Sequence, residues 1–377
     1  MKNILLALAL LTPVMMNAQN KKKGPKTFDL IVGAYTTDNS KGISVYRFYA
    51  ETGRLAYLSQ SDDVPNPSYL CIDKDKKFVY AVSETDNGEI YAYSFEPKGG
   101  VLTFINKQKS GGAAPCYISV DEDRKHVFVA NYSSGSFAAL PVNEDGSLKP
   151  PAQVIQDKGS GVNKQRQEGP HAHSAFLSPD EKYVLLTDLG TDKISIKKYD
   201  SGDSKPLGPA PVDFVSVAPG SGPRHLDFTP DKKYMYVVQE LTGAVTAFEF
   251  NGGKPKQIQS VTMLADGFRG AVGAADIHVS PDGRFVYASN RGDANEIVTY
   301  AINSETGMLT FIDRTPTRGK APRNFVIDPT GKFLLVGNQD TNTINVFKLD
   351  PASGKLGSMV TSTQVDKPVC LKFAPAM

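Results

Sequence analysis

Histidine, arginine and glutamate residues stand at equivalent places in successive repeats of this chain. His173, Arg224, Glu240 and Arg291 are the main candidates for catalysis. An imidazole, with an ordinary pKa of about 6.5, can act in turn as general base and general acid. Arginines can hold a carboxylate or phosphate or stabilise an oxyanion, and a glutamate can orient either partner. Together these residue types predict an anion-binding site with an acid–base group.

Further side chains are expected to contact a bound ligand, namely Arg323, Tyr132, His171 and Asn290. His171 and His173 lie two residues apart and so face the same side of a strand, which leaves open which imidazole is the acid–base group. The same spacing could suit a metal, but a third ligand is lacking, because His225 is expected on the strand face opposite Arg224. We therefore expect no metal and no cofactor.

A repeated unit must position these residues, because a similar string recurs along the chain. Its turn residue falls at positions 75, 123, 180, 231, 282 and 330, which are 48 to 57 residues apart. Each copy alternates apolar and polar residues, crosses a turn of the Pro-Asp-Gly-Lys type, alternates again, and continues into two further β-type runs. Four antiparallel strands per copy are typical of a β-propeller blade.

The two ends of the chain supply a seventh copy. Residues 367–375 match only the first strand of the unit, and residues 28–57 match only the other three. Pairing the termini would complete a blade and remove the free sheet edges of a linear array. The sequence therefore predicts an all-β fold. It is a single seven-bladed propeller of four-stranded antiparallel blades over residues 26–377, closed by its N- and C-terminal segments.

Two sets of positions should meet at one mouth of the central channel, where the first strand of each blade begins and the second ends. Seven residues before the turn positions, with the C-terminal equivalent last, stand Ser68, Cys116, His173, Arg224, Ala275, Arg323 and Val369. Nine residues after them, with the first-blade equivalent last, stand Glu84, Tyr132, Leu189, Glu240, Arg291, Gln339 and Tyr35. The charged members cluster in consecutive blades, which favours a binding site over simple solvation of polar loops.

The segment from Gln156 to Gly169 creates the longest spacing between turn positions and enters the blade that carries His173. Its Gly, Ser, Asn, Lys and Gln content leaves little to bury, so we expect a mobile loop on the same face as the site. Lys164 and Arg166 should add positive charge at the rim, where they would draw in an anion.

The composition argues against several classes of protein. Lys and Arg total 42 against 40 Asp and Glu, so the formal charge of +2 gives no bulk reason to expect nucleic acid as a partner. Cys71, Cys116 and Cys370 are too few for a disulfide framework and are expected in the core. The chain has no tryptophan, which excludes the Trp-Asp class of propeller. Beyond the N-terminus no apolar run approaches the roughly 20 residues of a membrane span, so no membrane partner is expected.

The N-terminus has the pattern of an export signal. Lys2 precedes an apolar run from Ile4 to Met16, and Met16-Asn17-Ala18 is a plausible cleavage site. We expect a signal peptide over residues 1–18, a flexible basic leader over residues 19–25, and a periplasmic or secreted protein.

Several motifs resemble those of one propeller family. They are Gly222-Pro-Arg-His225, Gln239-Glu240, the run from Ala274 to Arg284 with Tyr287-Ala-Ser-Asn-Arg291, and Ala321-Pro-Arg323. From Phe28 to the C-terminus the chain resembles the lactonase family, which includes cycloisomerase-type 6-phosphogluconolactonases and the carboxy-muconate lactonising enzyme. The resemblance implies metal-independent hydrolysis of a sugar-acid lactone, with a small anionic lactone or sugar acid as the ligand. It also implies a site made of His173, Arg224, Glu240 and Arg291.

Two alternatives remain open from the sequence. A non-catalytic propeller of the cell envelope could use the same basic mouth to bind an acidic sugar or peptide. A lactone-forming cycloisomerase acting on an unsaturated dicarboxylate could use the same arginines. The sequence predicts neither the particular lactone, nor whether it carries a phosphate, nor an oligomeric state.

Overall fold

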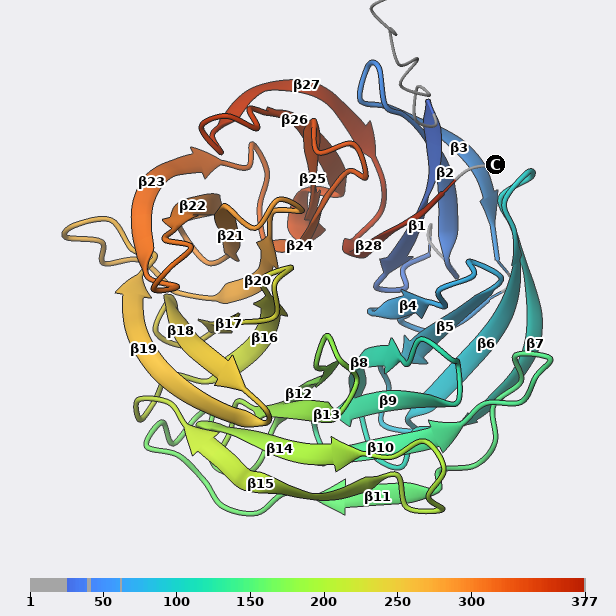
Figure 1. Cartoon of the computed structure of the whole chain (residues 1–377). Helices are drawn as coiled ribbons and strands as arrows, with labels where there is room; N and C mark the ends of the chain where they lie inside the picture. The colour runs from blue at the N-terminus through green and yellow to red at the C-terminus, as the bar shows by residue number, and fades with distance from the viewer. Residues whose placement is uncertain (1–25, 39–41, 62, 376–377) are drawn as a thin grey trace, which may run out of the picture.

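Seven four-stranded sheets stand in a ring around a central axis (Figure 1). The computed structural model describes residues 26–38, 42–61 and 63–375. Every pair of neighbouring strands within a sheet is antiparallel, and the helical part of the described chain is the short 3-10 turn η1 (Gln339–Thr341). The predicted all-β, seven-bladed propeller is confirmed.

The two inner layers of the blades form the channel wall and its support. The strands nearest the channel are β4 (Leu70–Ile72), β8 (Pro115–Val120), β12 (Ala172–Leu177), β16 (Pro223–Phe228), β20 (Ala274–Val279), β24 (Pro322–Ile327) and β28 (Pro368–Pro375). The second strands are β5 (Phe78–Ser83), β9 (His126–Asn131), β13 (Tyr183–Asp188), β17 (Tyr234–Gln239), β21 (Phe285–Asn290), β25 (Phe333–Asn338) and β1 (Thr27–Ala34).

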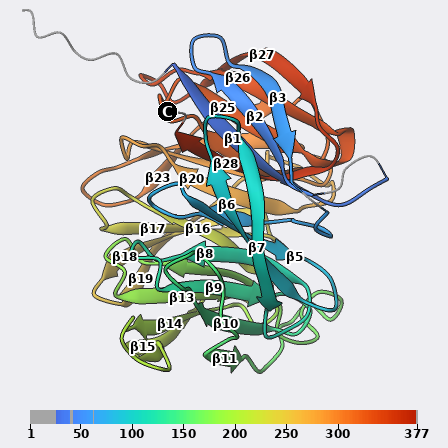
Figure 2. The same cartoon turned by 90° about the vertical axis from the view of Figure 1, so that its right-hand side faces the viewer.

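The two outer layers complete the sheets. The third strands are β6 (Glu89–Glu96), β10 (Ser136–Pro141), β14 (Lys193–Tyr199), β18 (Ala244–Asn251), β22 (Glu296–Ile302), β26 (Thr343–Leu349) and β2 (Ser44–Tyr49). The outermost strands are β7 (Val101–Lys109), β11 (Gln153–Gln156), β15 (Leu207–Ser216), β19 (Lys254–Thr262), β23 (Leu309–Pro316), β27 (Leu356–Gln364) and β3 (Arg54–Gln60). In the side view β7 faces the viewer along the outer edge of its blade (Figure 2).

Burial follows this layering. The second strands β9, β17, β21 and β25 are buried at every residue, because each lies between two strands of its own sheet and between two neighbouring blades. The outermost strands consist mostly of exposed and partly buried residues, and in β11 these two kinds alternate. The core therefore consists of apolar layers between adjacent blades, and each blade is stabilised mainly by its neighbours.

One local turn repeats between the first and second strands and sets the register of each hairpin. Two residues before the turn position, an Asp, Ser or Thr oxygen accepts a backbone N–H from the start of the second strand. Asp73 Oδ1 accepts from Phe78 at 2.8 Å, and Ser178 Oγ accepts from Tyr183 at 3.1 Å. The residue after the turn position has a positive φ, which suits Gly283 at 73°. These local hydrogen bonds and turn conformations require particular residue types at fixed positions. They therefore explain why the repeat can be recognised in the sequence.

The ring closes where the two ends of the chain pair. Strand β28 runs antiparallel to β1, with Leu30 opposite Phe373 and Val32 opposite Leu371. Leu30, Val32 and Leu371 are fully or almost fully buried at this junction. The predicted closure of the seventh blade by the two termini is confirmed, and it gives this blade the same number of strands as the other six (Figure 1).

A β-bulge interrupts most of the inner strands at the channel mouth. The register between first and second strands shifts between Pro115 and Tyr117, between Ala172 and Ser174, and in the three following blades. A bulge inserts an unpaired residue and redirects its side chain. The skipped residues include Cys116 and His173, both members of the first set of channel-mouth positions. The ladder irregularity thus aims these side chains at the mouth.

The expected signal peptide (1–18) and leader (19–25) lie outside the described residues. Within the described part of the chain, no helix has the length and apolar character needed to cross a bilayer.

Removing residues 367–377 should prevent formation of a stable monomer. The deletion takes away β28, leaves β1 with an unpaired edge, and exposes its buried neighbours. Size-exclusion chromatography and thermal unfolding by circular dichroism would measure the effect, and a chain ending at Pro375 is the matched control. A shortened protein that stays monomeric with unchanged melting would contradict the closure argument.

Candidate active site

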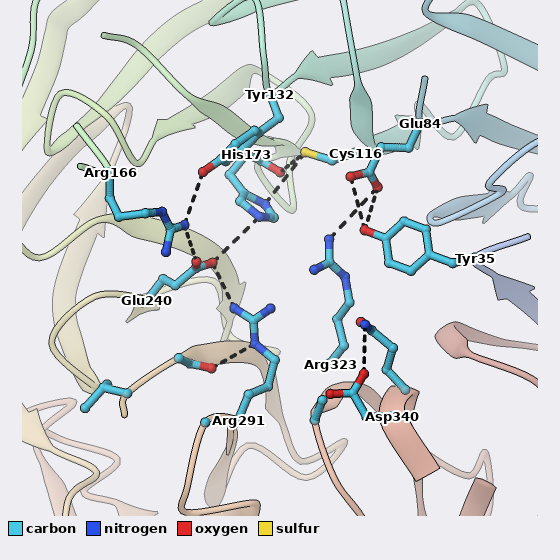
Figure 3. A pocket seen from close by; sticks show the side chains of 15 residues that line it. Tyr35, Glu84, Cys116, Tyr132, Arg166, His173, Glu240, Arg291, Arg323 and Asp340 are labelled. Carbon is cyan, nitrogen blue, oxygen red and sulfur yellow. Dashed lines mark hydrogen bonds and ion pairs between the residues drawn. The ribbon is translucent and has the colours of Figure 1, made fainter. Parts of the chain in front are cut away.

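A cavity of about 530 Å³ opens at the channel mouth (Figure 3). It is lined by Tyr35, Glu84, Cys116, Tyr132, Arg166, His173, Glu240, Val272, Gly273, Arg291, Gly292, Ala321, Arg323, Gln339 and Asp340. Nine of these belong to the two sets of positions counted from the turns, so the sequence predicted the location of the cavity. The strands place these residues because inner strands begin, and second strands end, at this mouth.

Glu240 is the centre of the charged cluster. Its Oε2 accepts from Arg224 Nε at 2.9 Å and lies 3.1 Å from Arg291 NH2, while its Oε1 accepts from Arg166 NH2 at 2.7 Å. Burial raises the pKa of this carboxyl group, but the three arginines outweigh burial and lower it far below its ordinary value. Glu240 is therefore a permanent carboxylate, and the cluster keeps an excess of positive charge.

The excess of positive charge also affects the pKa of Arg291. Burial, with Arg224 and Arg323 acting in the same direction, lowers the pKa of Arg291 to about 10 although Glu240 favours its charged form. Its Nε also donates to the carbonyl of Gly273 at 2.9 Å. An anion placed here would neutralise charge that the protein itself leaves unbalanced.

His173 faces the same carboxylate from β12. Its side chain is nearly fully buried, and its Nε2 lies 3.9 Å from Glu240 Oε2. Burial, followed by the charges of Arg224 and Arg323, lowers the pKa of His173 well below 6.5. The imidazole is therefore neutral near pH 7 and has a free lone pair for a proton.

A second charged group forms the opposite wall. Tyr35 donates its hydroxyl to Glu84, with 3.1 Å to each carboxylate oxygen, and the Arg323 guanidinium lies 4.0 Å from Glu84. Arg323 also packs over the ring of Tyr35, at 5.4 Å from the ring centre. Burial is the main reason that the pKa of Tyr35 rises to about 12. Figure 3 shows this group and the Glu240 cluster facing each other across the cavity.

The loop between β11 and β12 contributes more than the sequence predicted. Arg166 was expected to be a rim charge, but it bridges Glu240 and the Tyr132 hydroxyl, at 2.7 and 3.2 Å. The expectation that the loop buries little is wrong at Gln167, which is fully buried and donates to the Leu189 carbonyl at 2.9 Å. Lys164 is exposed, as expected. Gln167 anchors the loop, and this anchoring brings Arg166 into the cavity.

Three predicted site residues adjoin the cavity without lining it. Arg224 is almost completely buried behind Glu240. His171 stacks on Tyr132, with ring centres 4.6 Å apart, and pairs with Glu168 at the surface. Asn290 is buried and accepts from the backbone of Gly273 at 3.3 Å. The geometry thus brings His173, and not His171, to the Glu240 cluster.

Sequence reasoning overlooked several lining residues. Tyr35, Glu84, Cys116 and Gln339 were counted among the channel-mouth positions, but their residue types alone did not mark them as site residues. Cys116 is buried, as expected, and it also lines the cavity, with its Sγ 3.9 Å from His173 Nδ1. Asp340 had no sequence signal, because it lies in η1, beyond the repeated strands.

His225 also departs from the sequence expectation. Simple alternation placed it on the strand face opposite Arg224, but the β16 ladder shifts register between Pro223 and Leu226. Its Nε2 consequently lies 3.3 Å from Arg224 NH1. Among the residues that the structure describes, no group of three or more His, Cys, Asp or Glu side chains is arranged to hold a metal ion.

Comparison with known proteins finds relatives that match most of the chain. A 6-phosphogluconolactonase of Bacillus subtilis is 38% identical over 345 residues, covering 91% of this chain and 97% of the relative. A 6-phosphogluconolactonase of Formosa agariphila is 37% identical over 335 residues, covering 87% and 94%. The solved structure of a periplasmic gluconolactonase from Pseudomonas aeruginosa matches with a TM-score of 0.89 at 38% identity, covering 93% of this chain and 100% of that one.

The fold and the cavity together define a β-propeller with a polar site at one mouth of its channel. The chain belongs to the family described as Lactonase, 7-bladed beta-propeller, whose profile matches residues 29–373. The family resemblance inferred from the sequence motifs is confirmed.

The lowered pKa of His173 predicts the pH dependence of activity. If the neutral imidazole is the reactive form, kcat/KM should stay level as the pH falls through 6.5 and decline only at distinctly lower pH. A pH–rate profile from about pH 8 down to about pH 5 would test this, with circular dichroism at each pH as the control for folding. An acid limb centred at or above pH 6.5 would contradict the assignment.

Proposed function

We propose that the chain hydrolyses the ring ester of a sugar-acid lactone, as a 6-phosphogluconolactonase-like enzyme. The observation that carries this proposal is the neutral, buried His173 beside the Glu240 carboxylate, which gathers three arginines at one wall of the cavity. The names of the relatives from Bacillus subtilis, Formosa agariphila and Pseudomonas aeruginosa support the same reaction class.

In the proposed reaction His173 acts first as general base. It takes a proton from a water molecule, and the resulting hydroxide forms a bond to the lactone carbonyl carbon. Arg291 and Arg323 face the cavity with fixed positive charge and would stabilise the oxyanion of the tetrahedral intermediate, a contribution of roughly 3 kcal/mol per donor. The bond from the carbonyl carbon to the ring oxygen then breaks, and His173 returns its proton to that oxygen. The product is a hydroxy acid.

Glu240 has a supporting role in this scheme. Its lowered pKa prevents it from donating a proton near neutral pH, so it cannot be the general acid. It instead holds Arg166, Arg224 and Arg291 together around one carboxylate. Arg166 and Tyr132 lie at the entrance side of this cluster and would contact the anionic part of the substrate.

Lactone hydrolysis by the purified protein tests the proposal. Acid release from glucono-lactone and from its 6-phosphate ester should exceed the spontaneous rate for at least one of them. His173→Gln, which keeps a side chain of similar size, should lower kcat by about 100-fold or more, because the general base is lost. His171→Gln is the matched comparison and should have a much smaller effect, since His171 lies outside the cavity.

Other results would redirect the assignment. No turnover of any lactone, together with tight binding of a sugar acid, would favour a binding propeller. Loss of ultraviolet absorbance from a muconate would favour a lactone-forming cycloisomerase. An equal loss in both histidine variants would place the acid–base role outside His173 alone.

We also propose that the chain is exported to the periplasm. The support is the charged, apolar and small-residue pattern over residues 1–18, together with the periplasmic location named for the Pseudomonas aeruginosa relative. Expressed at full length in a Gram-negative host, the protein should appear in the periplasmic fraction with Gln19 as its first residue by mass spectrometry. Leu8→Arg, which interrupts the apolar run, should retain the full-length chain in the cytoplasm.

A further inference from the structure

A second buried imidazole lies next to the proposed general base. His225 on β16 is almost completely buried, and its ring packs edge-on against that of His173, with centres 5.3 Å apart. Tyr69 and Tyr117 pack against it from other blades, with ring centres 5.4 and 5.3 Å away. His225 takes part in no step of the proposed reaction, yet specific ring contacts hold it on several sides.

The neighbours of His225 permit only one placement of its proton. Its Nε2 lies 3.3 Å from Arg224 NH1, and its Nδ1 lies 2.8 Å from Asp276 Oδ1. A guanidinium can only donate, so Nε2 must carry a lone pair, and the proton must lie on Nδ1, where it is donated to the Asp276 carboxylate. Burial and then the Arg224 charge lower the pKa of His225 to about 3, in agreement with a neutral ring.

Arg224 continues this chain of contacts toward the cavity. Its NH1 donates to the Ala275 carbonyl as well as to His225, and its Nε donates to Glu240 Oε2 at 2.9 Å. Because its side chain is only 2% exposed, solvent cannot replace these partners. The orientation of the guanidinium therefore depends on acceptors that the protein supplies.

We propose that Asp276 and His225 are positioning residues for the reaction. Asp276 fixes the tautomer of His225. The unprotonated Nε2 of that ring accepts from Arg224 and so holds Arg224 against Glu240. The inference rests on the proposed function, because it assigns the pair a part in that reaction. Carboxylates that fix a histidine tautomer in this way act in other hydrolases.

The surroundings of Asp276 make one substitution particularly informative. Its Oδ2 faces three donors, His278 Nε2 at 3.0 Å, Asn324 Nδ2, and the backbone N–H of Phe325 at 3.3 Å. In Asp276→Asn the amide oxygen would occupy this position and the NH2 group would face His225. The NH2 would donate to Nδ1, so the ring proton would move to Nε2 and meet the N–H of Arg224.

In Asp276→Asn two buried donors would face each other, and Arg224 would be displaced. We therefore expect kcat to fall by about 10- to 100-fold. KM should change little, because Arg224 does not line the cavity. The charged and titratable groups around His173 are Cys116, Tyr132, Arg224, His225, Glu240 and Arg323. Displacing Arg224 removes one cation from this set, so the acid limb of the pH profile should move to higher pH.

Nitrogen-15 NMR of histidine-labelled protein would observe the tautomer itself. The chain has only five histidines, and His225→Asn would identify the His225 signals by their loss. In the unchanged protein near pH 7, Nδ1 should be protonated and Nε2 should not. In Asp276→Asn this pattern should be reversed. His278→Gln is the matched control, since it alters the Oδ2 side of Asp276 and should leave the tautomer and kcat unchanged.

Several outcomes would overturn the proposal. These are a proton on Nε2 of His225 in the unchanged protein, full kcat with an unmoved acid limb in Asp276→Asn, or an equal loss of kcat in His278→Gln. If the unchanged protein hydrolyses no lactone, the proposed function fails, and the NMR measurement still decides whether Asp276 sets the tautomer. If Asp276→Asn does not fold, the tautomer of the unchanged protein remains the deciding observation.

Discussion

The pairing of β1 with β28 is the constraint on which the rest of the structure depends. It joins the two ends of the chain in one blade and so holds all seven sheets in a closed ring. Closure also assembles the site, because Tyr35 follows β1 directly and its backbone N–H donates to the Lys367 carbonyl at 3.2 Å. Glu84 and Arg323 can meet this tyrosine only because the ring is closed. The pairing of β1 with β28 therefore supports both the stability of the ring and the geometry of the site.

Within the ring, the cost of burying charge explains the arrangement around Glu240. A buried carboxylate must be paired, and here three arginines and a histidine surround it. The arginines hold Glu240 ionised, and burial together with the charges of Arg224 and Arg323 keeps His173 neutral. The positive charge that remains prepares the cavity for an anion. The Asp276 carboxylate on the other side of His225 extends the same pairing deeper into the channel.

A symmetric scaffold yields an asymmetric site because the blades share a backbone and differ in side chains. The inner strands repeat a bulge at the mouth, and this bulge presents Cys116 in one blade and His173 in the next. The loop before β12 departs further from the repeat, since its buried Gln167 brings Arg166 across to Glu240. Catalytic variety on this fold can therefore arise at a few positions without altering the blade itself.

The sequence by itself determined the blades, their number, their closure and most of the cavity lining. These features depend on short-range chemistry: period-two burial along strands, and turns in which an Asp or Ser oxygen accepts a nearby N–H, as Asp73 and Ser178 do. Only the tertiary structure decided that Arg166 enters the cavity, that Arg224 lies behind it, and that His225 faces Arg224. Those contacts depend on bulges and on distances between blades. Alternation along a single strand contains neither, because the bulge in β16 changes which residues share a face, and because Arg166 and Glu240 lie 74 residues apart in the sequence.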